Sequence, residues 1–300
     1  MNTTLGDDGD SPHTFGGPWT TAKLSALALY LSAYTTALKD QHFRKWYIDA
    51  FAGSGDRADS EADAAFETRT LPGFDSVESE RSWAGSARIA LNTQPAFDHF
   101  VFIEQNGKWC EQLAALRTEF GRSEQEVEIL RGDANEALRR LSASDWRGRR
   151  AVLFLDPYGM QVDWTTLEAV ARSRAMDVWI LFPLGTVIRL MTRSGEMPVS
   201  WRRALDRVFG TGEWIDALYK PEPQRHLFGD DDERTRSTTD VVARYYNLRL
   251  RTLFPAVAAN PVTLRNSRNA PLYLLCFAAS NRAGAPIALR IAEHLLKGLV

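Results

Sequence analysis

Three short apolar runs in this sequence each end in a carboxylate. WYID (46–49) ends in Asp49 and leads into a glycine turn, HFVFIE (99–104) ends in Glu104, and AVLFLD (151–156) ends in Asp156. A carboxylate at the end of a buried strand needs hydrogen-bond donors or a positive charge close by, because burial without a partner is costly. The three acids therefore predict a ligand that presents hydroxyl groups or cations at one edge of a sheet. The alternative for each acid is a cap on the helix that follows it.

Small and polar residues follow these acids and a further apolar run, VEIL (127–130). The neighbouring residues that we expect to surround the ligand are Phe51, Ala52, Gly53, Ser54, Gly55, Gln105, Asp133, Ala134 and Asn135. A glycine turn lets the backbone approach a ligand, and Glu104 can accept hydrogen bonds from two ribose hydroxyls. Asp133 and Asn135 offer an acceptor and a donor to an adenine edge. Ordinary turn formation and helix capping are the alternatives, but the recurrence at successive strand ends favours a nucleoside cofactor.

The carboxylate beside the glycine turn separates two classes of cofactor. A dinucleotide carries an anionic pyrophosphate, which prefers a Gly-x-Gly-x-x-Gly turn at a helix N-terminus. Residues 53–55 supply only the first half of that fingerprint, and Asp49 lies close to them in the sequence. S-adenosyl-L-methionine carries an ammonium and a sulfonium, and acidic residues suit both groups. We therefore expect S-adenosyl-L-methionine rather than NAD, with Asp49 facing its positive end.

The segment Asp156-Pro157-Tyr158-Gly159 has the residue types needed for transfer to an exocyclic amine. Such an amine is a poor nucleophile because its lone pair is delocalised into the base. The Asp156 carboxylate and a backbone carbonyl of Asp156 or Pro157 would accept hydrogen bonds from the amine and localise that lone pair. Tyr158 would stack the flipped-out base, and Gly159 would allow close approach. The alternative is an ordinary turn, in which Asp, Pro and Gly are common.

Apolar runs and helical patterns alternate over the first two thirds of the chain. We expect strands at 45–51, 99–104, 127–130, 151–156 and 176–182, and helices at 22–39, 85–92, 109–120, 135–141 and after an Asp163 N-cap. Near-continuous apolar strands separated by helices are typical of a parallel sheet covered on both faces. With right-handed crossovers this gives a doubly wound, Rossmann-like α/β sheet, whose strands end at one ligand-binding edge.

The C-terminal part differs from a plain dinucleotide-binding sheet. Two strand patterns at 256–264 and 271–279, joined by a short connection, indicate a hairpin, and a helix is expected at 287–299. This arrangement favours the seven-stranded class I methyltransferase sheet, in which the last strand runs antiparallel. Helical patterns at 201–208, 213–219 and 240–254 indicate a helical insertion over about 186–254. We expect a flexible tail at 1–20 and a single elaborated domain at 21–300, with a long acidic loop at 56–82.

The composition is that of a globular protein without a strong electrostatic signature. The 300 residues are 44% hydrophobic and 25% charged, with a formal net charge of −2. Thirty of the 36 basic residues are arginine, and their clusters suit either solvated helix faces or a phosphate-contacting surface. Cys110 and Cys276 are isolated, as expected for core thiols in a reducing cytosol. The sequence shows neither metal-ligand spacing nor a long apolar run, so we expect a cytoplasmic protein without a metal or a membrane partner.

Five motifs, in order along the chain, resemble those of the three-Cys-motif partner proteins (TcmP): WYIDAFAGSG, FVFIE, RGDAN, VLFLDPYGMQVDW and DVWILFPLG. The N-terminal W-x3-K-L pattern and PLYLLCFAAS extend the resemblance over nearly the whole chain. It implies a bacterial protein with a fold like that of class I methyltransferases, found alongside a three-cysteine, radical-SAM-like partner protein. More distantly, DAFAGSG resembles the first motif of rRNA guanine-N2 methyltransferases. Asp-Pro-Tyr-Gly is similar to the Asp-Pro-Phe-Gly of tRNA guanine dimethyltransferases, and it departs from Asp-Pro-Pro-Tyr in the position of its aromatic residue.

These observations lead to one main functional hypothesis and two alternatives. The main hypothesis is an S-adenosyl-L-methionine-dependent N-methyltransferase that acts on an exocyclic amine of a nucleobase in RNA or DNA. The first alternative is a non-catalytic cofactor-binding or docking partner of the three-cysteine protein, and the second is methylation of a protein amide. A basic face beside the pocket, with Arg189, Arg193 or Arg202, would favour nucleic acid.

Overall fold

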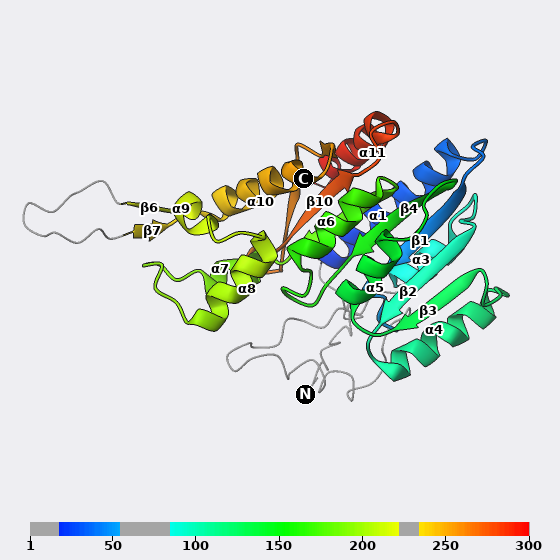
Figure 1. The fold of residues 1–300 in the computed structure, drawn as a ribbon, viewed down its shortest axis with the longest axis horizontal. Coiled ribbons are helices and arrows are strands. Elements are labelled where there is room, and N and C mark those ends of the chain that lie inside the picture. The colour runs from blue at the N-terminus through cyan, green and yellow to red at the C-terminus, as the bar shows by residue number, and fades with distance from the viewer. Residues whose placement is uncertain (1–17, 55–84, 222–233, 300) are drawn as a thin grey trace, which may run out of the picture.

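A central α/β sheet organises the protein (Figure 1). The computed structural model describes residues 18–54, 85–221 and 234–299. Within these residues the sheet has eight strands: β1 (Arg44–Asp49), β2 (His99–Glu104), β3 (Val127–Arg131), β4 (Arg149–Leu155), β5 (Met176–Phe182), β8 (Ala256–Val257), β9 (Val262–Arg265) and β10 (Pro271–Ala279). Their order is β3-β2-β1-β4-β5-β10, and β8 and β9 both pair with β10. β1 to β5 are parallel, and β10 runs antiparallel to β5. The predicted doubly wound sheet with an antiparallel C-terminal hairpin is confirmed.

One predicted strand is divided in two. The run at 256–264 forms β8 and β9, which are separated by residues 258–261. Pro261 has no amide hydrogen to give to a ladder, so a continuous strand is disfavoured at this point. The carbonyl of Ala258 accepts a hydrogen bond from the Asn247 amide at 3.0 Å, which fixes the connection against a helix. The sheet therefore has eight strands where seven were predicted.

The described helices are α1 (Pro18–Ala37), α3 (Ser86–Asn92), α4 (Gly107–Glu119), α5 (Ala134–Ser142), α6 (Trp164–Ser173), α7 (Leu184–Leu190), α8 (Val199–Phe209), α9 (Trp214–Leu218), α10 (Thr239–Leu253) and α11 (Ala285–Lys297). α1 begins at Pro18, so residues 18–20 belong to a helix rather than to the predicted tail. Proline suits the first turn of a helix, and Trp19 is buried and stacks on Tyr273 with ring centroids 5.2 Å apart. The rest of the tail and the predicted loop at 56–82 lie outside the described residues.

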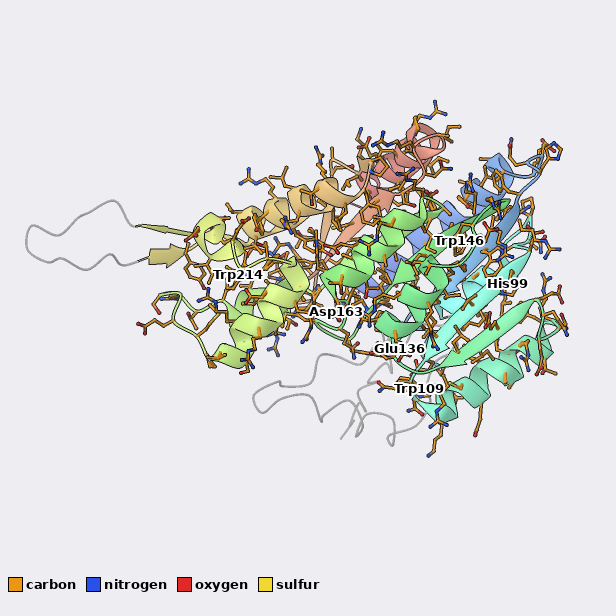
Figure 2. All side chains as sticks on the ribbon, viewed as in Figure 1. His99, Trp109, Glu136, Trp146, Asp163 and Trp214 are labelled. Carbon is orange, nitrogen blue, oxygen red and sulfur yellow. The ribbon has the colours of Figure 1, made fainter. Side chains whose placement is uncertain are left out.

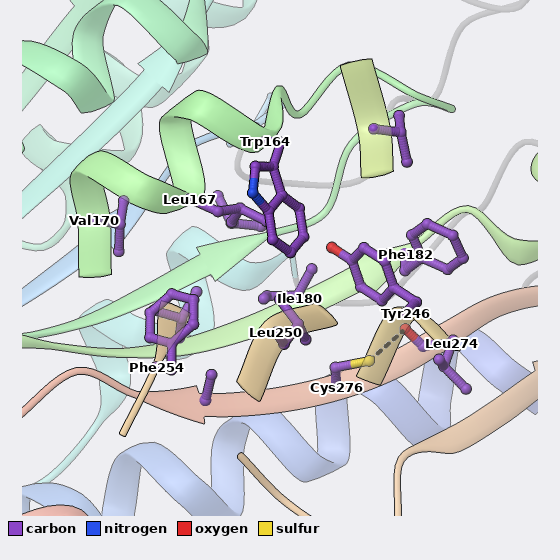
Figure 3. Packing of buried hydrophobic residues seen from close by; sticks show 14 of the residues in the cluster. Trp164, Leu167, Val170, Ile180, Phe182, Tyr246, Leu250, Phe254, Leu274 and Cys276 are labelled. Atoms are coloured by element: carbon purple, nitrogen blue, oxygen red, sulfur yellow. Dashed lines mark hydrogen bonds between the residues drawn. The ribbon is translucent and has the colours of Figure 1, made fainter. Parts of the chain in front are cut away.

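Alternation along the strands creates a hydrophobic core on each face of the sheet. Tyr47 contributes to the core beneath α1, α3 and α11, while the next residue, Ile48, contributes to the core beneath α5, α6 and α10. Figure 3 shows the second core where α6 and α10 pack over β5 and β10. There the ring of Tyr246 stacks on Phe182 with centroids 3.7 Å apart. Helices thus cover both faces of the sheet, so a ligand would bind at an edge of the sheet rather than on a face.

The predicted helical insertion is confirmed, and it also contains a small sheet. α7, α8, α9 and α10 follow β5, and β6 (Tyr219–Pro221) pairs antiparallel with β7 (Arg234–Arg236) within them. In Figure 1 these elements lie on the opposite side of the molecule from α4 and β3.

Across the described part of the chain, no helix combines the length and apolar character needed to cross a membrane.

Candidate functional site

The order of the strands places a switch point between β1 and β4. From β1 the chain moves outward to β2 and β3, and it then returns to β4 on the other side of β1. In open α/β sheets, ligands bind at the carboxyl ends of the strands beside such a reversal. Asp49 ends β1 and pairs with Phe154, two residues before Asp156. Glu104 ends β2, the other neighbour of β1, so the three predicted carboxylates reach one edge of the sheet.

Asp49 is fully buried among uncharged hydrogen-bond donors. Its Oδ2 accepts from the Tyr47 hydroxyl at 3.2 Å, and its Oδ1 accepts from the Phe51 amide at 3.3 Å. Ser86, at the start of α3, adds a hydrogen bond. Burial, together with the nearby charge of Asp156, raises the pKa of Asp49 to about 7, and the three hydrogen bonds act against this rise. A cation bound beside Asp49 would favour its ionised form, so this carboxyl suits a positively charged ligand.

Glu104 connects the ends of β1 and β2 through its buried carboxylate. Its Oε2 accepts from the Gly53 amide at 2.9 Å, and its Oε1 accepts from the Asn106 amide at 2.7 Å. A carboxylate offers about four acceptor sites, so Glu104 could also accept from a ribose hydroxyl. Gly53 has a φ of +59°, and a Cβ atom there would meet no described residue within 4 Å. Glycine is therefore favoured at this turn by the backbone conformation.

Asp156 has an ionic partner that the sequence did not reveal. The Lys23 Nζ lies 2.6 Å from the Asp156 Oδ2, and the side chains are 7% and 22% exposed respectively. Lys23 belongs to α1, where it lies one turn after Trp19 and over its ring, 4.7 Å from the centroid. Lys23 is four residues after Trp19, so the sequence could have predicted that both lie on the buried face of α1. α1 thus contributes a cation directly to the predicted catalytic segment.

The turn after Asp156 presents an aromatic ring. Pro157 is buried, whereas Tyr158 is 56% exposed, and Gly159 has a φ of +72°. The amide of Tyr158 donates to the Gln161 Oε1 at 2.9 Å, which closes the turn. An exposed tyrosine next to a carboxylate at a strand end is the arrangement that a stacking platform requires.

Asp133 and Asn135, which were predicted to contact an adenine edge, both make hydrogen bonds within the fold. Asp133 caps α5, since its Oδ1 accepts from the Glu136 amide at 2.9 Å. The Asn135 Oδ1 accepts from the Asp163 amide and the Thr166 hydroxyl, both at 2.9 Å, and its Nδ2 donates to the Gln161 carbonyl at 2.8 Å. Asn135 therefore fixes the end of the Asp156 turn, and it acts as a positioning residue.

The other predicted ligand-contacting residues lie around the first two strand ends. Phe51 is half-buried, Ala52 is buried with its amide donating to the Ile103 carbonyl at 3.1 Å, and Ser54 is half-buried. Gln105 is exposed beside Glu104, and Ala134 is the buried first residue of α5. Gly55 lies outside the described residues.

Asp163 precedes α6 as predicted, but its carboxylate does not cap the helix. Arg207 of α8 approaches it, with Nε 2.9 Å from Oδ1. This ion pair fixes α8 to the start of α6. Figure 2 shows Asp163 near Glu136 at one end of the layer formed by α5 and α6, and Trp146 at the other end. In the part of the chain that the structure describes, no three His, Cys, Asp or Glu side chains gather as a metal site.

Comparisons with known proteins find matches among solved structures at low sequence identity. No family model matches the chain, and the curated proteins contain no match. Among solved structures, protein LPL1258 from Legionella pneumophila covers 92% of this chain and 91% of its own, with 11% identity and a TM-score of 0.45. Spermidine synthase from Thermotoga maritima covers 88% and 61%, with 10% identity and a TM-score of 0.39. The methyltransferase domain of bacterial CtHen1-C covers 85% and 98%, with 9% identity and a TM-score of 0.35. At these values the function must rest on the residues of this chain.

Proposed function

We propose that this protein is an S-adenosyl-L-methionine-dependent N-methyltransferase. The observation that carries the proposal is the position of Asp49 and Asp156, which flank the switch point of the sheet at the ends of β1 and β4. Glu104 holds the glycine turn beside them. Asp49, which is buried, suits the binding of a cationic group of the cofactor. Asp156 lies beside it, where it could bind the amine that accepts the methyl group.

The residues present fit the cofactor in charge and hydrogen-bonding capacity. Asp49, whose described hydrogen-bond partners are all uncharged, would face the ammonium or the sulfonium. Glu104 would accept from ribose hydroxyls while it holds the amide of Gly53. The cofactor, when bound, supplies an electrophilic methyl group. A pyrophosphate would instead meet two carboxylates, which disfavours a dinucleotide.

Asp156 and its turn would orient the acceptor amine. Lys23 occupies the Asp156 Oδ2, so Oδ1 is the oxygen that we assign to the amine. With a backbone carbonyl of Asp156 or Pro157, it would accept both amine hydrogens and localise the nitrogen lone pair. The carboxylate could then hold the proton that the amine loses. Tyr158, largely exposed, would stack the base that carries the amine.

The substrate class that we favour is a nucleobase in RNA or DNA. An exposed aromatic beside a carboxylate suits a flat, amine-bearing ring, and a nucleobase has both properties. α7 begins directly after β5 at the same edge of the sheet and carries Arg189, and Arg193 follows it. These cations would contact phosphates near the site. A three-cysteine, radical-SAM-like protein is the proposed partner, on the resemblance to TcmP proteins alone.

A methyl-transfer assay tests this function. The protein is incubated with methyl-labelled S-adenosyl-L-methionine and, separately, with RNA, DNA and protein from a bacterial lysate. Asp156→Asn is the test variant, because its amide oxygen can still accept from Lys23. Glu124→Gln is the matched control, because its side chain is 80% exposed and lies before the start of β3, whereas the site lies at the ends of the strands.

The expected result is label in nucleic acid with the wild type and with Glu124→Gln. Loss of at least about a hundredfold is expected with Asp156→Asn, while cofactor binding is retained. Label in protein alone would support the amide alternative. Cofactor binding without transfer to any fraction would support a non-catalytic docking protein. Undiminished transfer by Asp156→Asn would remove Asp156 from the mechanism.

A further inference from the structure

A pocket lies at the edge of the sheet opposite to the candidate site. Its volume is about 540 Å³, and it lies where the chain enters β4 and β5. The connections from α5 to β4 and from α6 to β5 form its walls. The basic and hydroxyl residues that line it include Arg147, Arg150, Arg172, Arg174, Ser142 and Ser144. β4 is seven residues long, so about 20 Å of strand separates this pocket from Asp156.

The lining of this pocket is strongly cationic. Four arginines face a single lining carboxylate, that of Asp145, which pairs with Arg147 at 2.8 Å. Arg172 pairs with Glu168, one turn earlier on α6, at 3.7 Å. Arg174 has no ion-pair partner among the residues that the structure describes. The pocket therefore keeps positive charge after its internal pairs are counted.

Two buried donors at this pocket also lack partners. Ser142 is 8% exposed, and its hydroxyl makes no hydrogen bond with any described residue. The Nε of Arg150 is likewise without a partner in the described chain, although its Nη1 donates to the Arg149 carbonyl at 2.6 Å. Buried donors are rarely left unsatisfied in native proteins. Both donors belong to lining residues of the pocket, and a rotation of either side chain is needed for its buried donor to reach a bound acceptor.

The backbone at Arg174 adds an independent observation. Arg174 follows the end of α6 with a φ of +55°, a left-handed conformation in which glycine or asparagine is common. An arginine here costs conformational energy, which its guanidinium would offset by binding an anion. Guanidinium groups bind phosphate oxygens with two parallel hydrogen bonds, and serine hydroxyls add single ones.

We infer that this pocket binds the phosphate groups of a small phosphorylated ligand, of up to about the size of a nucleotide. The volume suits such a ligand, since sites for small molecules commonly enclose about 300 to 1,000 Å³. The charge and the unpaired donors select an anion with several oxygens. The pocket is remote from Asp49 and Asp156, so it is a site separate from the one proposed for methyl transfer.

Titration calorimetry with pyrophosphate and with AMP at low ionic strength tests the inference. Arg174→Gly removes the guanidinium while it suits the left-handed backbone, so the variant should fold at least as stably as the wild type. The matched control is Arg203→Ala. Arg203 is exposed on α8, and alanine replaces one arginine there without a penalty to the helical backbone. Ser142→Ala probes the buried hydroxyl.

For each ligand, we expect Arg203→Ala to bind with the same affinity as the wild type. Arg174→Gly should bind about tenfold more weakly, and Ser142→Ala several-fold more weakly. Asp49→Asn should bind as the wild type does, which separates this test from that of the proposed function. An absence of binding at millimolar ligand, or equal binding by Arg174→Gly, would overturn the inference. Tighter binding of a single-stranded oligonucleotide than of either small ligand would overturn the assignment to a small molecule.

Discussion

Asp49 is a carboxyl group whose ionisation depends on what binds beside it. Its pKa is raised to about 7 by burial, and a cationic ligand would lower that pKa. At pH 7 we therefore predict that binding of S-adenosyl-L-methionine releases roughly half a proton per site. Calorimetry in buffers of different ionisation enthalpy measures this number, and Asp49→Asn should abolish the release. Binding whose heat is independent of the buffer would show that Asp49 does not face the cation.

The pair of Lys23 and Asp156 predicts an asymmetry between its two partners. Asp156→Ala removes one partner of the Lys23 ammonium, whose side chain is 7% exposed, whereas Lys23→Met removes the cation beside a carboxylate whose side chain is 22% exposed. We expect Asp156→Ala to lower the free energy of unfolding by about 2–4 kcal/mol and Lys23→Met by about 1–2 kcal/mol. Urea unfolding of both variants and of the double variant measures the coupling. Strictly additive losses would contradict a direct interaction.

At the scale of single residues, spacing predicted the acids but not their partners. Asp49, Glu104 and Asp156 could be assigned to one edge because each ends an apolar run. Lys23 is 133 residues from Asp156 in the chain, so only the packing of α1 brings them together. For Asn135, the position after a strand predicted a ligand contact, but it did not predict the hydrogen bonds to Asp163 and Thr166.

At the scale of elements, the junction of α6 and α8 depends on a glycine. Gly210 follows the last residue of α8 with a φ of +71°, and a Cβ atom there would overlap the indole of Trp164, the first residue of α6. Arg249 of α10 packs on the same indole, 4.7 Å from its centroid. The three helices therefore meet where Gly210 leaves room.

We predict that Gly210→Ala destabilises the protein by about 3 kcal/mol, through overlap and through the left-handed backbone together. Gly121, which has a φ of +61° and where a Cβ atom would meet nothing within 4 Å, is the matched control. Gly121→Ala should cost only about 1 kcal/mol. Thermal and urea unfolding measure both, and equal losses would show that Trp164 moves aside without cost.

Element boundaries were predictable where one face or both faces of a segment are apolar. β5 was predicted with its observed bounds because all seven of its residues are buried. β4 begins two residues earlier than predicted, at Arg149, because backbone pairing with β1 continues where the side chains have become polar. The break between β8 and β9 depends on Pro261 and on a contact from α10, which periodicity does not contain.

At the scale of the whole molecule, two buried acids link stability to pH. Burial raises the pKa of Asp49 to about 7 and that of Asp177, which accepts from the Tyr30 hydroxyl at 2.8 Å, to about 6. Both values lie above those of the unfolded chain, so between about pH 4 and 7 the folded state binds more protons than the unfolded state. Each group therefore stabilises the fold most at low pH, and this contribution is lost as the pH rises through its folded pKa.

We predict that Asp49→Asn and Asp177→Asn each become more stable relative to the wild type as the pH rises from 5 to 7.5. The slope should reach up to about 1.4 kcal/mol per pH unit for each group. Comparison of each variant with the wild type removes the contribution of the other titrating groups. Urea unfolding at several pH values gives the difference, and a difference that is independent of pH would mean that these acids ionise alike in both states.

The central claim is that S-adenosyl-L-methionine binds at the carboxyl ends of β1 and β2. Its most direct test is the affinity of the purified protein for S-adenosyl-L-methionine, measured by calorimetry at pH 7 for the wild type, Asp49→Ala, Glu104→Ala and the surface control Glu124→Gln. We predict binding by the wild type and the control, and affinities at least about tenfold weaker for the other two variants. No binding by the wild type, or unchanged affinity in Asp49→Ala and Glu104→Ala, would contradict the account.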